Sequence, residues 1–189
     1  IGSGKSFISK LFGYPVFNAD NEVKYIYKKN RKCFNKLKKQ LPKFIKTFPV
    51  RKEELISAIN SNKKNIKLIS SIVHPLVRES MKKFMTKNKK RKLVILDIPL
   101  LIENKLNKKK DIIIFIQSHN SKVLQRIKKR PFFNGKLIKS LKENQVILSK
   151  KRKLANYIIN NNYSLHIMKK KINMIKKEIL NERNSSRFW

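Results

Sequence analysis

The first six residues carry the clearest chemistry in the chain. They read Ile1-Gly2-Ser3-Gly4-Lys5-Ser6 and run directly into an amphipathic stretch, Lys5–Phe12, which predicts a helix. This spacing matches the second half of the phosphate-binding motif G-x-x-x-x-G-K-[ST]. Its glycines let backbone N–H groups converge on phosphate oxygens, and the start of the helix adds partial positive charge. The lysine of such a loop reaches the β- and γ-phosphates, and the hydroxyl that follows ligates Mg²⁺.

The first glycine of this motif would lie two positions before Ile1, preceded by the strand that feeds the loop. We therefore expect that roughly ten residues, including this strand, precede the given sequence, since such a strand is central to the sheet of this kind of fold. The alternative is a Gly-Ser loop that precedes Lys5-Ser6 by coincidence. On the phosphate-loop hypothesis, the predicted ATP-binding residues here are Gly2, Ser3, Gly4, Lys5, Ser6 and Phe7.

Two acidic residues lie at the ends of predicted strands. Asp20 follows the short strand Pro15–Phe17, and Asp97 ends the strand Leu93–Asp97. Phosphoryl transfer needs an acid beside the acceptor hydroxyl, which we assign to Asp20, and an acid for Mg²⁺, which we assign to Asp97 opposite Ser6. The alternatives are that Asp20 only caps a following helix and that Asp97 is a buried acid at a turn.

Basic residues near the middle of the chain could close over an anion. Arg126 and Arg130 are four apart and share one face of a predicted helix, where they could neutralise the transferring phosphoryl group. Lys151 and Arg152 could complete this group. The alternative is a solvated basic face, because Lys128 and Lys129 lie between the two arginines. The predicted catalytic residues are Lys5, Asp20, Arg126 and Arg130.

Short β-branched runs separated by helical patterns must position these residues. The runs Leu93–Asp97, Asp111–Ile116 and Tyr157–Ile159 are continuously apolar, which is typical of parallel strands covered on both faces. Gly13 stands where a glycine ends the helix that begins at Lys5. The sequence therefore predicts an α/β fold, with a parallel sheet and helices on both of its faces.

Long helical segments fill most of the remaining chain. Residues 21–72 read as helical, with interruptions at Pro42 and Pro49, and residues 65–85 predict a helix broken or kinked at His74-Pro75. Residues 165–181 predict a last helix, and its apolar stripe comprises Ile167, Met168, Ile172, Ile175 and Ile179. With no internal repeat and no Pro/Gly/Ser-rich linker, residues 1–189 predict a single domain.

Composition limits the classes of protein. The 189 residues include 48 Lys and Arg against 11 Asp and Glu, a net charge of +37, yet a hydrophobic fraction of 40% argues against a disordered chain. No apolar run approaches the roughly 18 residues that cross a membrane. The single cysteine, Cys33, cannot form an internal disulfide, so we expect a cytoplasmic protein without a membrane partner.

The positive charge raises nucleic acid as an alternative partner, because lysine and arginine neutralise phosphates. The excess is nearly all lysine, spread along the whole chain, and its dense runs lie mostly beside element ends without interleaved aromatic residues. We therefore predict no specific nucleic-acid partner. A basic nucleic-acid-binding protein with an incidental Gly-Lys-Ser loop remains the competing hypothesis.

Several local motifs occur in order along nearly the whole chain. Together they resemble the dephospho-coenzyme A kinase family: Val16-Phe-Asn-Ala-Asp20, Ile72-Val-His-Pro-Leu-Val-Arg78, Asp97-Ile-Pro-Leu-Leu-Ile-Glu103, the Arg126 and Arg130 pair, Gln145, and Ala155-Asn-Tyr-Ile-Ile-Asn-Asn161. The resemblance implies a P-loop NTPase-like core with a helical substrate-binding insertion at 21–90 and a lid at 121–153. It implies transfer of the ATP γ-phosphoryl group to the ribose 3′-hydroxyl of dephospho-coenzyme A, with Mg²⁺, the last step of coenzyme A biosynthesis. We expect a monomer.

The resemblance also assigns further residues. It places the acceptor, dephospho-coenzyme A, against Asp20, His74, Arg78, Pro99, Leu100 and Glu103, and it places Asn160 near the adenine of ATP. Taken alone, His74 before a proline reads as a packed or kink residue. Two positions depart from the family's pattern: Asn18 stands where an Asp-x-Asp motif has its first acid, and Asn156 replaces an acid. Another small P-loop nucleoside or nucleotide kinase remains the alternative enzyme.

Overall fold

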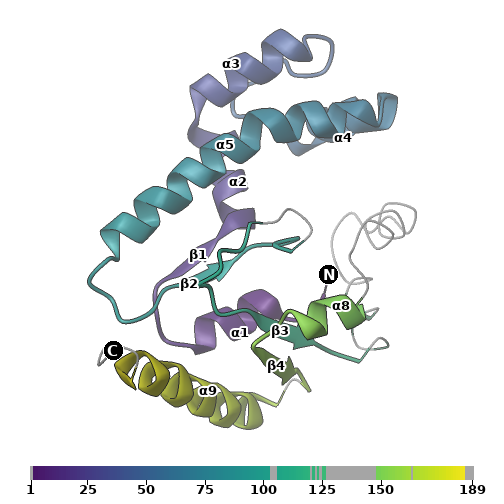
Figure 1. Cartoon of the computed structure of the whole chain (residues 1–189). Coiled ribbons are helices and arrows are strands. Elements are labelled where there is room, and N and C mark those ends of the chain that lie inside the picture. Colours follow the sequence, from purple (N-terminus) through teal and green to yellow (C-terminus); the bar gives the residue numbers. More distant parts are fainter. Residues whose placement is uncertain are drawn as a thin grey trace. The chain divides into compact units, whose positions relative to one another are not determined.

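The computed structural model describes residues 2–102, 106–119, 121, 123, 125–126, 148–162 and 164–185. The chain divides into two compact units, and Figure 1 shows their elements coloured along the sequence. Unit 1 comprises Ile1–Val16 with Pro99–Trp189, and unit 2 comprises Phe17–Ile98. Among the described helices, none is long and apolar enough to cross a membrane.

Unit 2 is a helical bundle joined to two short strands. Strand β1 (Val16–Asn18) hydrogen-bonds to β2 (Ile95–Asp97) in a two-stranded sheet. Four helices lie between them in sequence: α2 (Ala19–Lys29), α3 (Arg31–Gln40), α4 (Lys52–Ser61) and α5 (Lys64–Lys87). Helix α5, teal in Figure 1, packs against the other three. The core between these helices contains Ile26, Cys33, Leu37, Leu41, Ile45, Val50, Leu55, Ala58, Ile69 and Val73.

Local side chains fix where the helices of unit 2 begin. The side-chain oxygen of Asn30 accepts a hydrogen bond from the backbone N–H of Cys33 at 2.8 Å and caps α3. Glu54 lies in the first turn of α4. Its carboxylate accepts hydrogen bonds from three backbone N–H groups that precede the helix, those of Lys46, Thr47 and Arg51. The loop that contains Pro42 and Pro49 is closed in this way, and the predicted interruptions at both prolines are confirmed.

Helix α5 corrects one prediction. It runs unbroken for 24 residues through Pro75, so a break at His74-Pro75 is wrong, whereas the alternative of a kink there stays a prediction. A proline removes one backbone hydrogen bond from a helix interior. The turns before Pro75 are held by buried Ile69 and Val73, which pack in the core of unit 2. Partly buried Leu76 and Val77 pack against the same core after Pro75, and this packing keeps the helix continuous.

Unit 1 contains the second sheet. Strands β3 (Ile114–Gln117) and β4 (Tyr157–Asn160) pair in parallel, with Ile116 beside Ile159 and both side chains buried. Helix α1 (Lys5–Leu11) packs against α9 (Leu165–Ser185), and the six-residue α8 (Leu148–Lys153) precedes β4. The parallel α/β fold predicted from the sequence is confirmed, as is Gly13 beyond the end of α1, with φ +71°.

Two features of unit 1 differ from the sequence prediction: the start of β3 and the buried stripe of α9. The strand expected from Asp111 begins only at Ile114, because the Asp111 carboxylate accepts a hydrogen bond from the Lys108 N–H and makes a turn. In α9, Ile167 is 48% exposed and does not belong to the buried stripe. The buried side chains Met168, Ile172, Ile175 and Ile179 follow a spacing of four, three and four, which leaves Ile167 on a neighbouring face.

Candidate active site

The residues predicted to do chemistry fall into two groups, one in each unit. In unit 1, Gly2 and Gly4 have φ values of +79° and +87°, in the left-handed region that favours glycine. Gly4 caps α1 by its backbone, and its carbonyl accepts the Ile8 N–H at 3.0 Å. The loop therefore has the backbone form that a phosphate-binding loop needs before a helix.

Asn161 supports this loop from the end of β4. Its side-chain amide donates a hydrogen bond to the Ser3 carbonyl at 2.9 Å, and the residue is only 3% exposed. Its backbone N–H donates to the Gln117 carbonyl at 2.8 Å, and its own carbonyl accepts from the Ser118 hydroxyl at 3.2 Å. These hydrogen bonds connect the carboxyl ends of β3 and β4 to the loop. In parallel α/β sheets, ligands bind at the carboxyl ends of the strands.

A side chain on Gly4 has no room. A Cβ built there would collide with the Asn161 amide nitrogen and would lie 3.5 Å from the Arg126 Nη1 atom. Arg126, an exposed residue, therefore reaches the Gly2–Gly4 loop, and its role there stays a prediction. Arg130, its predicted partner on the same helix face, lies outside the described residues.

The other predicted residues of unit 1 vary in exposure. Lys5 is partly buried, Ser6 is exposed, and Phe7 is 41% exposed. Asn160, predicted near the adenine, is exposed at the end of β4, whereas its neighbour Asn161 turns inward to Ser3. Sequence reasoning missed Asn161 because three consecutive asparagines, 160–162, offer no pattern that tells which one is buried.

The acceptor residues predicted on the Pro-Leu-Leu segment also belong to unit 1. Pro99 is partly buried, Leu101 is partly buried, and Leu100 is 36% exposed. Leu100 has φ +54°, a backbone conformation that costs free energy for a residue other than glycine and that occurs most often at functional sites. Glu103 lies outside the described residues. In α8, Lys151 is partly buried and Arg152 is exposed.

In unit 2, the end of β1 meets the end of β2 through side chains. The Asn18 amide nitrogen donates a hydrogen bond to Asp97 Oδ2 at 2.6 Å, and Asp97 is 6% exposed. The Asn18 side-chain oxygen accepts the Asn21 N–H at 2.8 Å and caps α2. The alternative that Asp20 is the cap is therefore wrong: Asp20 is exposed at the second position of the helix.

His74 and Arg78 lie one turn apart on α5, and both are exposed. Partial desolvation of the imidazole lowers the pKa of His74 below its ordinary value, and the positive charge of Arg78 lowers this pKa further. His74 is consequently a neutral imidazole at physiological pH, which can accept as well as donate a hydrogen bond.

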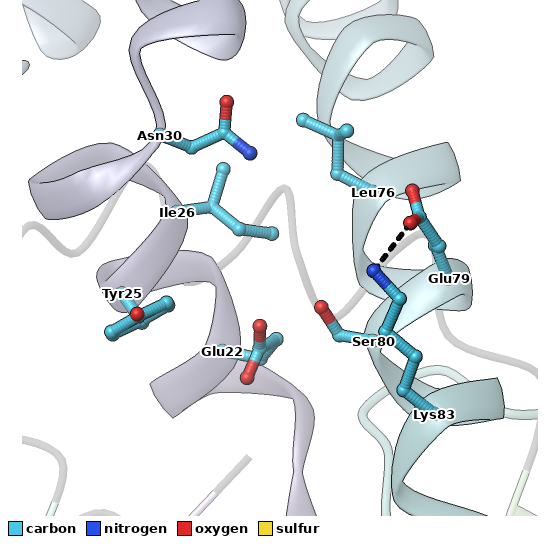
Figure 2. Close-up of a pocket in the computed structure, with 8 residues that line it drawn as sticks. All are labelled: Glu22, Tyr25, Ile26, Asn30, Leu76, Glu79, Ser80 and Lys83. Atoms are coloured by element: carbon cyan, nitrogen blue, oxygen red, sulfur yellow. Dashed lines mark ion pairs between the residues drawn. The ribbon is translucent and has the colours of Figure 1, made fainter. Parts of the chain in front are cut away.

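A small hollow between α2 and α5 is separate from the predicted residues of unit 2. Figure 2 shows its lining and the ion pair at 2.7 Å between Glu79 and Lys83. Its volume is about 100 Å³, well below what a nucleotide-sized ligand requires. The hollow is lined by Glu22, Tyr25, Ile26, Asn30, Leu76, Glu79, Ser80 and Lys83.

The residues that could hold Mg²⁺ are few and of the expected kind. Within the described ranges, no group of three or more His, Cys, Asp or Glu could hold a metal. Magnesium bound beside nucleotide phosphates needs only one or two protein oxygens, because phosphates and water supply the remainder. The Asp97 carboxylate and the Ser6 hydroxyl are hard oxygen donors that fit this chemistry.

The class of P-loop nucleotide-binding proteins is indicated by three features: a left-handed glycine loop before a helix, a Lys-Ser pair at the start of that helix, and parallel strands that end at the loop. The family model described as "Dephospho-CoA kinase" matches residues 1–166. The chain therefore belongs to the dephospho-CoA kinase family. Enzymes of this family phosphorylate dephospho-coenzyme A with ATP as donor, which is the final step of coenzyme A biosynthesis. The family and the function predicted from the sequence are therefore confirmed.

Curated relatives agree with this assignment, and two solved structures share the fold. The dephospho-CoA kinase of Wolbachia pipientis wMel is 31% identical over 169 residues, covering 87% of this chain and 86% of that protein. The dephospho-CoA kinase of Bartonella quintana is 31% identical and covers 85% and 84%. A Thermus thermophilus crystal structure, 23% identical, superposes with a TM-score of 0.74 over 94% of this chain and 93% of that one. The Campylobacter jejuni dephospho-CoA kinase, 22% identical, has a TM-score of 0.64 over 95% and 93%.

Proposed function

We propose that this chain transfers the γ-phosphoryl group of ATP to the ribose 3′-hydroxyl of dephospho-coenzyme A through the residues described above. The observation that carries the proposal is the left-handed Gly2–Gly4 loop, which is held by Asn161 and has Arg126 beside it. In this proposal the backbone N–H groups of the loop and the first turn of α1 bind the ATP phosphates. Phe7 lies in that turn, and Asn160 lies on the adenine side.

The transfer requires a base or an orienting group at the acceptor hydroxyl, and we assign this role to Asp20. The acceptor oxygen forms a bond to the γ-phosphorus, while the bond between that phosphorus and the β–γ bridging oxygen breaks and its electron pair leaves with ADP. The proton of the hydroxyl passes to the Asp20 carboxylate. Asp20 is exposed at the first turn of α2, which suits a group that must meet a substrate.

Cations stabilise the charge that develops on the transferring group. Lys5, Arg126 and Arg130 take this role, with Lys151 and Arg152 completing the lid that we propose for residues 121–153. Bound Mg²⁺ would neutralise phosphate charge and orient the β- and γ-phosphates. Ser6 and Asp97 would hold it.

Further residues are assigned to binding of the acceptor. Arg78 would bind the acceptor's phosphates, neutral His74 would hydrogen-bond the acceptor, Pro99 and Leu100 would contact its apolar parts, and Glu103 would fix that loop. The helical insertion at residues 21–90 is proposed to bind this substrate. A lone buried thiol, Cys33, suits a reducing compartment, so we propose action in the cytoplasm. Action as a monomer stays a prediction, which sedimentation would check.

The test is ADP production by the full-length protein with ATP and Mg²⁺, in the presence of dephospho-coenzyme A, of AMP, or of no acceptor. Turnover that depends on dephospho-coenzyme A and places the new phosphate on its 3′-oxygen supports the proposal. Turnover with AMP alone would instead assign the chain to nucleotide kinases. Retained turnover at physiological salt also separates the kinase from a non-specific nucleic-acid binder, whose binding falls steeply with salt.

Matched variants test the assigned roles. Lys5→Ala should abolish most transfer with the fold intact, whereas Lys10→Ala, an exposed lysine in the last turn of the same helix, should leave it near normal. Asp20→Asn should lower kcat far more than it weakens ATP binding. Normal turnover in Lys5→Ala, or equal losses of ATP affinity and kcat in Asp20→Asn, would contradict these assignments.

A further inference from the structure

One asparagine in unit 2 links two acidic positions. Asn18 uses both ends of its side-chain amide: the nitrogen donates to Asp97 Oδ2 at 2.6 Å, and the oxygen accepts the Asn21 N–H at 2.8 Å. The first contact holds a carboxylate at the end of β2. The second caps α2, whose first turn carries Asp20.

We propose that Asn18 is a positioning residue for phosphoryl transfer, which orients the Asp97 carboxylate through its amide nitrogen and the Asp20 turn through its amide oxygen. This inference rests on the proposed function, in which Asp97 holds Mg²⁺ and Asp20 serves the acceptor hydroxyl. Asn18 touches neither substrate in this proposal. It acts through the two acids.

The contact with Asp97 has a clear physical purpose. A carboxyl group that is 6% exposed needs hydrogen bonds to offset the cost of burying its polar atoms. A donor on Oδ2 fixes the orientation of the carboxylate and leaves Oδ1 and further lone pairs for a metal or its water shell. An acid at position 18 could not donate in this way and would set a second negative charge against Asp97. A neutral amide therefore suits this chain.

The contact with Asn21 gives the second half of the argument. An asparagine side chain that accepts the N–H of the third helical residue is a strong N-cap. The cap fixes the first turn of α2, and Asp20 lies within that turn. The same rigid amide plane connects the cap to Asp97, so a change at Asn18 affects both acids together.

Two substitutions remove the contact with Asp97 and keep the helix cap. Asn18→Ser keeps a capping oxygen but is too short to reach Asp97, and Asn18→Asp keeps the cap while adding a charge against Asp97. Asn30 offers a matched control: it caps α3 in the same way, accepting the Cys33 N–H at 2.8 Å, and it has no place in the proposed machinery. Asn30→Ser should change neither kcat nor stability appreciably.

The kinetic readout is the split between kcat and KM. We expect Asn18→Ser to lower kcat about tenfold while the KM for ATP stays within about twofold, because the lost contact orients Asp97 and does not bind the nucleotide. Asn18→Asp also removes the amide donor to Asp97 and should lower kcat at least as much. A kcat of Asn18→Ser equal to that of the wild type would reduce Asn18 to a helix cap and overturn the inference.

A stability readout is independent of activity. Asn18→Ser should lower the Tm by about 4 °C in the wild-type background, since a hydrogen bond to a charged group is lost. In an Asp97→Ala background the same change should have little effect, because the acceptor is already absent. Equal Tm shifts in both backgrounds would overturn the Asn18–Asp97 link.

These readouts also separate failure of this inference from failure of the proposed function. A wild-type protein that phosphorylates AMP but not dephospho-coenzyme A would contradict the proposed substrate. The kcat comparison of Asn18→Ser with Asn30→Ser would then be made with AMP, where the same tenfold loss is expected. The Tm comparison needs no substrate at all.

Discussion

The Asn161 side chain donates a hydrogen bond to the Ser3 carbonyl at 2.9 Å, across a separation of 158 residues in the sequence. This bond joins the end of β4 to the glycine loop ahead of α1. Since Asn161 is 3% exposed and its backbone is held by Gln117 and Ser118, the amide is a fixed support for the loop. The loop's shape therefore depends on a residue near the other end of the chain.

Replacement of that support should weaken nucleotide binding. We expect Asn161→Ala to raise the Kd for ATP about tenfold, because the Ser3 carbonyl loses its buried donor. An unsatisfied buried carbonyl costs about 1–3 kcal/mol of free energy. Titration calorimetry with ATP measures the change. Asn162→Ala is the control, since Asn162 is exposed and its side chain accepts only a local hydrogen bond from the Ser164 N–H among those recorded. Equal ATP affinities of Asn161→Ala and the wild type would contradict a supporting role.

Two glycines allow a controlled test of the same loop. Gly4 and Gly13 both have positive φ, +87° and +71°, but a Cβ on Gly4 would meet Asn161 whereas one on Gly13 would meet nothing within 4 Å. Gly13→Ala should cost only the backbone penalty, about 1 kcal/mol, with normal ATP binding. Gly4→Ala should in addition lose most ATP affinity.

The collision at Gly4 can be relieved by a second change. In an Asn161→Ala background, Gly4→Ala should cost less ATP affinity than it does in the wild type, because the obstructing amide is gone. Calorimetry on the four proteins of this cycle gives the coupling. Strictly additive losses would show that the backbone angle at Gly4, and not Asn161, forbids a side chain there.

Local patterns predicted the elements well but not their contacts. Glycine and lysine spacing placed the loop before α1, and β-branched runs placed β2, β3 and β4 to within a few residues. These signals are local, because each depends on side chains a few positions apart. The Asp111 turn escaped prediction because an aspartate beside an apolar run reads equally well as the start of a strand.

The supporting residues of the site depend on distant partners. The sequence alone predicts Asn18 only as a neutral replacement for an acid, yet Asn18 reaches Asp97, 79 residues away, and caps α2 in place of Asp20. Asn161 was not distinguished from Asn160 and Asn162. An asparagine donates and accepts equally well at the surface and in the interior, so its type does not reveal its partner.

The single cysteine provides a test of the core of unit 2. Cys33 is fully buried, and burial raises the pKa of its thiol to about 11, although the charge of Lys36 acts in the opposite direction. We expect Cys33 to resist thiol reagents at pH 8 in the native protein and to react quickly in denaturant. Rapid labelling of the native protein would contradict the packing of α3. Leu37→Ala, in the same core, should increase labelling by lowering stability about 2–5 kcal/mol.

The pair on α5 makes a prediction about pH. Desolvation and the charge of Arg78 lower the pKa of His74 in the folded protein below the ordinary value of 6.5. As pH falls through 6.5, the unfolded chain takes up this proton first, so the contribution of His74 to stability is greatest above that pH and declines below it. The decline ends once the folded imidazole is also protonated.

Removal of the neighbouring charge should shift this balance. In Arg78→Gln the pKa of His74 should rise, because the repulsion is gone while the desolvation remains, and the loss of stability in mild acid should shrink. NMR titration of the three imidazoles, with the signal of His74 assigned by His74→Gln, measures the pKa of His74 in the wild type and in Arg78→Gln. An unchanged pKa in Arg78→Gln would show that the two side chains do not interact. A change would mean that a phosphate group binding to Arg78 also raises the pKa of His74, because the anion offsets the charge that opposes protonation.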